Sequence, residues 1–203
     1  MTIDCTLLAN YANTKPSAES SLCVVPLERS QYSTLKIILQ AWEDEAANIA
    51  EKLSKTPSEK ERQVFIDSQC ICLGIELELS NNPDPYQIYV CRNAKQEKTL
   101  GVIVTSGNGS SAVQIEWLAT SPRYIRSPVN EPRPFKRIGA MLLQHAENVA
   151  CIQGKKEMIL TAFSQAVPFY LAHGYQKDPN ALMHKTLSSV TQATDPIFGK
   201  KAA

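Results

Sequence analysis

The sequence predicts a single mixed α/β domain, and three patterns support that fold class. Strand-like runs with short connections occupy residues 86–92, 100–105 and 112–120. An amphipathic helical pattern follows from about residue 138 to residue 153. An apolar run at 157–163 then precedes a short helix and a last strand-like run. Short connections make the first strands antiparallel neighbours, and interleaved helices and strands are typical of mixed α/β domains.

Length, composition and charge narrow the class of protein further. The chain has 203 residues and is 43% hydrophobic, enough for one sizeable core. A net charge of +1 does not favour a nucleic-acid partner. No apolar run is long enough for a bilayer, and Met1–Cys5 does not begin a signal peptide. We therefore expect a cytoplasmic protein without a membrane partner. Its six cysteines match no zinc spacing, so we expect reduced thiols and no metal.

The domain is expected to span residues 21–187. Residues 1–20 are polar and mixed, which predicts an N-terminal segment that is poorly ordered or forms a surface strand. Residues 188–203 are polar with a basic end and are predicted to be a tail.

The first elements of the domain are a short strand and two helices. Residues 21–27 hold the apolar run Leu22–Val25, which is bounded by Pro26 and predicts a short strand. Residues 29–53 carry apolar side chains at three- and four-residue steps, as a helix does. Thr56–Glu59 provides an N-cap threonine and a proline at the first helical position, so a second helix is expected to run towards Ser68.

Residues 71–79 fit two structures. Apolar residues alternate with polar ones, which favours a strand, but the same residues also recur at four-residue steps, which suits a helix. The pattern by itself leaves both open.

The second half of the chain is delimited by prolines and glycines. Pro122 ends the third strand of the meander and begins a basic, proline-rich loop over residues 122–136. Gly154 is a plausible C′ residue for the helix at 138–153. The apolar run at 157–163 suits a parallel strand, and Pro168 and Gly174 bound the next helix. The last strand is expected at 182–187.

Three motifs, in order, resemble those of the GNAT superfamily of N-acetyltransferases. They are the strand Val113–Pro122 with its acidic residue, the loop and helix start Arg137–Leu143, and the Phe-Tyr and His-Gly-Tyr signature in Ala166–Tyr175. The resemblance covers roughly residues 86–187. It implies a mixed, mostly antiparallel central sheet flanked by helices, and because the family places helices before its meander, it favours a helix at 71–79.

The resemblance implies acetyl-CoA as the co-substrate. Helix N-termini bind anions through unpaired N–H groups, so the start of the helix after Arg137 would bind the pyrophosphate, with charge added by Arg137. The end of the preceding strand would contact the pantetheine arm. The cofactor-binding residues expected on this basis are Leu118, Ala119, Thr120, Arg137, Ile138, Gly139, Ala140 and Met141.

Two further residues have the chemistry that acetyl transfer needs. An alkyl amine has a pKa near ~10, so a base must take a proton before it attacks. Glu116 is the candidate base, directly or through water, and the other interpretation is a solvent-facing strand residue. Tyr170 matches the family position of the acid that protonates the leaving thiolate. The other interpretation of Tyr170 is a core aromatic residue.

The function expected is therefore N-acetyl transfer from acetyl-CoA to an amine acceptor by direct attack, with the acceptor unidentified. The alternative is a non-catalytic binding or scaffold protein with the same fold. Pro134 and Arg137 motivate it, because they stand where the family has Arg or Gln and a first glycine. Dimerisation is common in the family, so a homodimer stays open.

Overall fold

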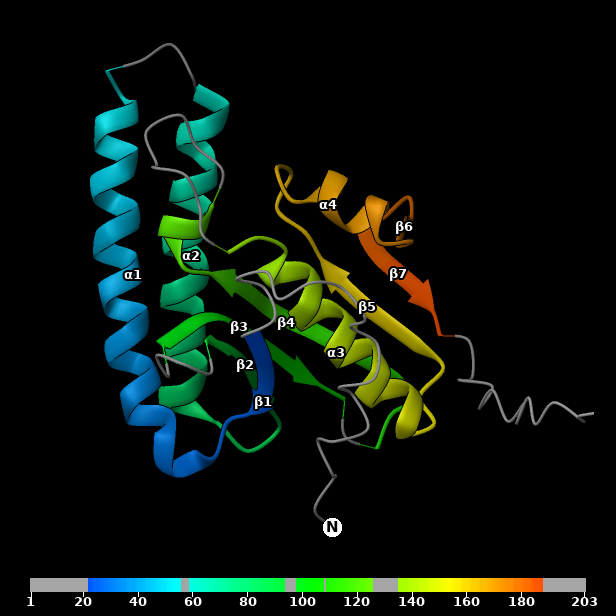
Figure 1. The fold of residues 1–203 in the computed structure, drawn as a ribbon. Coiled ribbons are helices and arrows are strands. Elements are labelled where there is room, and N and C mark those ends of the chain that lie inside the picture. The colour runs from blue at the N-terminus through cyan, green and yellow to red at the C-terminus, as the bar shows by residue number, and fades with distance from the viewer. Residues whose placement is uncertain (1–21, 56–58, 94–97, 108, 126–134, 188–203) are drawn as a thin grey trace, which may run out of the picture.

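The computed structural model describes residues 22–55, 59–93, 98–107, 109–125 and 135–187. They form one seven-stranded sheet in the order β1-β2-β3-β4-β5-β7-β6, with helices on both faces (Figure 1). The sheet is antiparallel except for the β4–β5 pair. This is the mixed, mostly antiparallel sheet that was expected. The predictions for residues 1–20 and 188–203 lie outside the described residues.

The strands agree closely with the predicted ones. Their bounds are β1 Leu22–Pro26, β2 Gln87–Asn93, β3 Lys98–Ser106, β4 Ala112–Thr120, β5 Glu157–Thr161, β6 Gln176–Lys177 and β7 Leu182–Thr186. The meander β2-β3-β4 is antiparallel, and β5 is the parallel strand that its apolar run predicted. The sequence did not predict β6, because a strand of two residues is too short to show a periodic pattern.

The helices flank the sheet on both faces. They are α1 Tyr32–Leu53, α2 Glu59–Asn81, α3 Ile138–Ile152 and α4 Val167–Ala172, with short 3₁₀ turns η3 Arg29–Gln31 and η4 Pro122–Tyr124. Helices α1 and α2 lie side by side on one face of the sheet, and α3 covers the other (Figure 1). No helix in the described part of the chain has the length and apolar character needed to span a membrane.

The ambiguous segment 71–79 is helical, as the family resemblance favoured. Cys72, Ile75 and Leu79 are buried at helical spacing, whereas Leu73 and Leu77 are 46% and 53% exposed. The alternation of apolar and polar residues in the sequence therefore combined a buried helical stripe with two exposed leucines. The expected helix end near Ser68 was wrong, because α2 continues without interruption to Asn81. The predicted cap, Thr56 and Pro57, lies outside the described residues.

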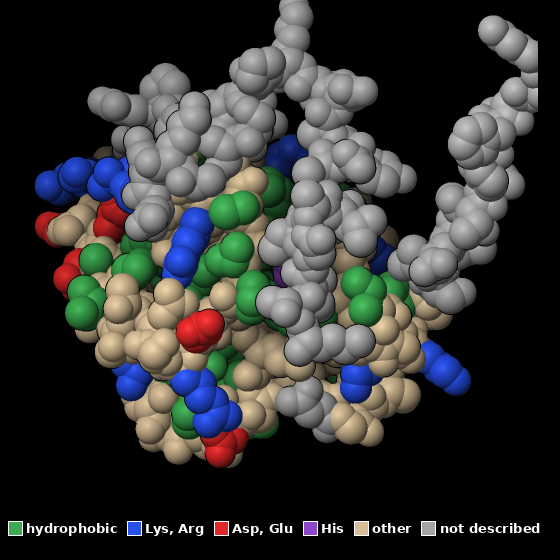
Figure 2. Space-filling model, turned by 60° about the horizontal axis from the view of Figure 1, so that its bottom comes forward, with side chains coloured by type: hydrophobic (Ala, Val, Ile, Leu, Met, Phe, Trp, Pro, Cys, Tyr) green, Lys and Arg blue, Asp and Glu red, His purple; other side chains and the backbone are tan. Residues whose placement is uncertain are grey.

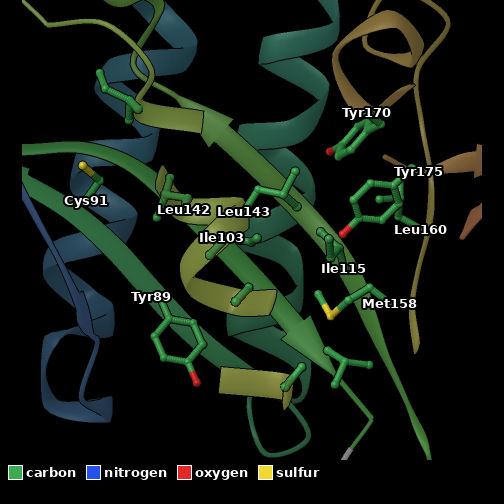
Figure 3. Close-up of a cluster of buried hydrophobic side chains, with 14 of the residues drawn as sticks. Tyr89, Cys91, Ile103, Ile115, Leu142, Leu143, Met158, Leu160, Tyr170 and Tyr175 are labelled. Carbon is green, nitrogen blue, oxygen red and sulfur yellow. The ribbon is translucent and has the colours of Figure 1, made fainter. Parts of the chain in front are cut away.

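Helix α3 packs closely on the sheet because β3 offers a glycine at the contact. A Cβ at Gly101 would lie 2.7 Å from Ile138 Cγ2 and 2.8 Å from Leu142 Cδ1. The core between α3 and the sheet contains Leu142, Leu143, Met158 and Leu160, as Figure 3 shows. Gly154 ends α3 with φ of 72°, and Lys155 N–H donates to the Ala150 carbonyl, so the predicted C′ glycine is confirmed.

A bulge in β4 changes which face its side chains point to. Val104 of β3 pairs with Trp117, but the next residue, Thr105, pairs with Ile115, so Glu116 is the extra residue. Before the bulge, Ile115 packs in the core under α3. After it, Trp117 packs in the core under α1 and α2. Without the extra residue, the period-2 alternation would have kept Trp117 on the α3 face.

The pairing of β4 with β5 stops halfway along β4. The parallel ladder runs from Ala112–Glu157 to Ile115–Leu160 and ends there, while β4 continues to Thr120. Among the described strands, Trp117–Thr120 therefore pairs with β3 alone, and its other edge faces an opening in the sheet.

Candidate active site

A cavity of about 290 Å³ lies where β4 and β5 separate. We call it the β4–α4 cavity. Its walls come from three parts of the chain: α2, the end of β4, and the segment from β5 into α4. Helix α2 contributes Val64, Asp67, Ser68 and Ile71, and the end of β4 contributes Leu118–Thr120. The segment from β5 into α4 contributes Phe163, Gln165, Ala166, Phe169 and Tyr170, and Ile125 and Gly139 also line the cavity.

A second cavity of about 380 Å³ lies at the N-terminus of α3. We call it the α3 cavity. It is bordered by Lys136–Ala140, by Tyr124 and Phe135, and by His173 at the end of α4. The two cavities share Thr120, Ile125, Gly139 and Phe169 as lining residues. The two cavities therefore adjoin at these four residues.

The first turn of α3 has backbone donors available to an anion. Met141 N–H donates to the Arg137 carbonyl at 2.9 Å, so it is used within the helix. No described residue accepts a hydrogen bond from the N–H groups of Ile138, Gly139 or Ala140. These three residues line the α3 cavity, as does Arg137, but Met141 does not. Unpaired N–H groups and the positive end of the helix dipole attract phosphate.

Arg137 has the backbone conformation of a glycine. It is the N-cap of α3, with φ of 61° and ψ of 18°, in the left-handed region. That region costs a residue with a Cβ roughly 1–2 kcal/mol. The resembling family has its first glycine at this position, and the structure keeps the glycine-like turn although the residue is arginine.

Gly139 lies where the two cavities meet. A Cβ there would lie 3.6 Å from Phe169 Cζ and 3.7 Å from Thr120 Oγ1, which are ordinary van der Waals distances. The glycine thus leaves about one methyl group of space between α3, β4 and α4. That space lies beside the free N–H groups, so Gly139 lets a ligand approach the backbone.

Tyr170 lines the β4–α4 cavity from α4 and is 7% exposed. Its ring packs edge-on against Phe169 and Tyr175, at centroid distances of 5.1 and 5.6 Å. Figure 3 shows Tyr170 and Tyr175 next to each other at the α4 end of the core. Burial raises the pKa of Tyr170 to about 12, so its hydroxyl is protonated at neutral pH.

Glu116 lines neither cavity. Its Oε1 accepts a hydrogen bond from Ser106 Oγ at 2.5 Å, and its Oε2 accepts one from Gln114 Nε2 at 2.9 Å. It stands one residue beyond the last β4–β5 pair, at the bulge. Both of its oxygens therefore have hydrogen-bond donors within the protein. A substrate in either cavity would not meet this carboxylate among the described lining residues.

The other predicted cofactor-binding residues lie at the end of β4. Leu118, Ala119 and Thr120 line the β4–α4 cavity, and Thr120 also reaches the α3 cavity. Asp67 and Ser68 of α2 and His173 after α4 were not among the predicted site residues. No local pattern marks Asp67 and Ser68, because their place depends on how α2 packs on the sheet. The His173 ring lies 4.4 Å from that of Phe169, and its Nδ1 lies 2.7 Å from the Phe169 carbonyl oxygen.

Among the described residues that line the two cavities, the charged side chains are Asp67, Lys136 and Arg137, and they carry both signs. On the face shown in Figure 2, lysine and arginine side chains are interspersed with acidic and hydrophobic ones. Arg123, just after β4, donates through Nε and Nη2 to Glu45 Oε1 of α1, at 3.0 and 2.9 Å. That pair ties the turn beside the α3 cavity to the helical layer on the other face.

Comparison with solved structures identifies the fold. A PaiA N-acetyltransferase of Thermoplasma acidophilum, solved in complex with coenzyme A, is 16% identical with a TM-score of 0.53, and the match covers 82% of this chain and 99% of that one. A protein assigned to the GNAT family of acetyltransferases from Desulfovibrio desulfuricans is 12% identical with a TM-score of 0.52, over 82% and 99% of the two chains. No protein-family model and no curated protein matches the sequence.

Proposed function

We propose, from the GNAT fold of this chain, that it is an acetyl-CoA-dependent N-acetyltransferase. One observation supports this most directly. The β4–β5 ladder ends at Ile115–Leu160, and the opening beyond it adjoins a helix N-terminus with unpaired N–H groups. An elongated ligand with a phosphate group at one end and a reactive group at the other fits that arrangement.

The α3 cavity would bind the pyrophosphate of CoA. The N–H groups of Ile138, Gly139 and Ala140 are the donors, and Arg137 and Lys136 add positive charge. The free edge of β4 at Leu118–Thr120 offers backbone N–H and C=O groups to the amides of the pantetheine arm. Ala119 contributes to this edge and packs on the α1/α2 side of the sheet.

Acetyl-CoA supplies a thioester whose carbonyl carbon is attacked by the amine. A C–N bond forms and the C–S bond breaks, so the amine must lose a proton and the sulfur must be stabilised as it leaves. Tyr170 donates a hydrogen bond from its protonated hydroxyl to the leaving sulfur. Glu116, at the bulge, takes the amine proton through water, since it does not line the cavity itself.

Calorimetry with CoA and acetyl-CoA tests the proposal, followed by an acetyl-transfer assay on a panel of primary amines. We expect saturable CoA binding and release of free thiol that depends on the amine. A well-folded protein that binds no CoA at millimolar concentration would refute CoA-dependent catalysis. The Gly139→Val variant is the control, because its larger side chain would fill the junction of the two cavities.

Arg137 favours a second candidate, a non-catalytic protein that keeps this fold. A side chain with a Cβ occupies the left-handed position at the entrance to α3, beside the donors that phosphate needs. This candidate is compatible with CoA binding and with its absence. It predicts that the protein transfers no acetyl group to any amine. Turnover with a single amine would exclude it.

A further inference from the structure

The acceptor side of the β4–α4 cavity has a carboxylate that the proposed chemistry has not used. We propose that Asp67 of α2 binds the ammonium group of the acceptor, and that the acceptor is a primary monoamine with an apolar body. This inference rests on the proposed function, and it names the class of substrate. Asp67 acts here as a binding residue that selects and positions the amine.

Asp67 is held in place and keeps one oxygen available. Gln63 Nε2, one turn earlier on α2, donates to Asp67 Oδ1 at 2.7 Å. No described residue donates to Oδ2. Among the described residues that line the cavity, Asp67 is the only carboxylate. An arriving ammonium group can therefore form a charge-assisted hydrogen bond with Oδ2 without displacing the Gln63 contact.

Ser68, the next residue on α2, adds a neutral oxygen to the same wall. It is 4% exposed and lines the cavity. An ammonium group has three donors and accepts no hydrogen bonds. A carboxylate with an adjacent hydroxyl matches that requirement better than a wall of apolar side chains does.

Most of the remaining cavity wall favours an apolar body for the acceptor, although Thr120 and Gln165 also line it. Val64, Ile71, Leu118, Phe163 and Phe169 line it with aliphatic and aromatic groups. Phe163 is 39% exposed and thus presents ring surface that a ligand could cover. A second ammonium group, as in a diamine, would meet these apolar groups without a second carboxylate among the described lining residues.

Glu116 does not compete for this role. Its two oxygens already accept from Ser106 and Gln114, and it lines neither cavity. The two carboxylates thus lie at different positions. Asp67 lines the β4–α4 cavity, whereas Glu116 lies at the β4 bulge. The amine would be bound as a cation at Asp67 before it loses its proton.

The test measures binding, so that it does not depend on turnover. Calorimetry at neutral pH compares phenethylamine with 2-phenylethanol, which has the same skeleton but no charge, with and without saturating CoA. The variants are Asp67→Asn and the matched control Asp44→Asn. Asp44 on α1 also accepts from a glutamine one turn earlier, Gln40, but it is exposed. Thermal unfolding confirms that each variant is folded.

We expect wild type to bind the amine at least ~10-fold more tightly than the alcohol, the range of one hydrogen bond to a charged group. Asp67→Asn should remove this preference, and Asp44→Asn should keep it. The proposal is overturned if wild type shows no preference, or if folded Asp67→Asn retains it. Tighter binding of putrescine than of phenethylamine would overturn the monoamine class. If wild type keeps its preference for the amine but binds no CoA, the proposed function is refuted and the role of Asp67 in amine binding is not.

Discussion

Gly74 of α2 lies directly against the indole ring of Trp117 of β4. A Cβ at Gly74 would lie 2.5 Å from both Cη2 and Cζ2 of that ring, well inside van der Waals contact. This contact sets how closely α2 approaches the sheet just beyond the bulge. It also fixes the wall that carries Asp67 and Ser68 relative to the end of β4.

Replacement of Gly74 by alanine should destabilise the protein. Helix propensity alone would favour alanine by about 1 kcal/mol. Overpacking against a rigid ring typically costs ~1–3 kcal/mol, so we expect a net loss of roughly 1 kcal/mol in urea unfolding. The double variant Gly74→Ala/Trp117→Leu is the control, because it removes the ring that clashes. If the two substitutions prove additive, the contact does not limit the packing of α2.

Gly139→Ala should separate folding from ligand binding. The added methyl group meets Phe169 and Thr120 only at 3.6 Å and beyond, so stability should stay the same or rise by up to ~1 kcal/mol. The same methyl group occupies the space next to the free N–H groups, so CoA should bind about tenfold more weakly. Melting temperature and calorimetry measure the two effects. Unchanged CoA affinity would mean that the pyrophosphate lies elsewhere.

Arg137 can be tested with two variants that isolate its backbone and its charge. Arg137→Gly should stabilise the protein by roughly 1 kcal/mol, because φ of 61° carries no penalty for glycine. Arg137→Ala keeps the backbone strain and removes the guanidinium. If the charge binds phosphate, both variants should lose CoA affinity to the same extent. Full affinity in both would leave the backbone N–H groups as the phosphate site.

Tyr170→Phe should lower kcat by up to ~10²-fold and leave KM for acetyl-CoA nearly unchanged. The effect falls at the low end for acid assistance, because a hydroxyl with a pKa of about 12 is a weak donor to a thiolate whose own pKa is near ~8.5. The ratio of wild-type to variant kcat should be constant between pH 7 and pH 10, since Tyr170 does not ionise in that range. A ratio that has fallen by about half at pH 10 would show that the pKa of Tyr170 is not raised above the ordinary value of ~10.

Stability should fall steadily at alkaline pH. Burial raises the pKa of the Cys72 and Cys91 thiols to about 12 in the folded protein, from ~8.5 in an unfolded chain. Above pH 8.5 the unfolded chain therefore releases protons that the folded chain retains, which favours unfolding up to about pH 12. Each thiol contributes a slope of about 1.4 kcal/mol per pH unit. Urea unfolding from pH 8 to pH 10 measures it, and Cys91→Val should show a shallower slope.

Much of the fold could be predicted from sequence because its elements have strong local signals. The meander has short connections, and α3 begins after a basic loop and ends at Gly154. Residues 71–79 were harder, because a buried helical stripe and two exposed leucines together imitate a strand pattern. The tyrosine and the helix start of the candidate site lie in recognisable motifs. Asp67 and Ser68 lie in an ordinary helix, and only its packing brings them to the cavity.

The sequence by itself determined the order of most elements, the position of the turns and the motifs at Gly139 and Tyr170. These depend on interactions between residues close together in the chain, which local patterns record. The tertiary structure alone decided where β4 leaves β5 and that Glu116 is the extra residue of a bulge. A bulge is defined by the register between two strands, and one residue of register moves Trp117 to the opposite face, against Gly74. No single strand's sequence contains that information.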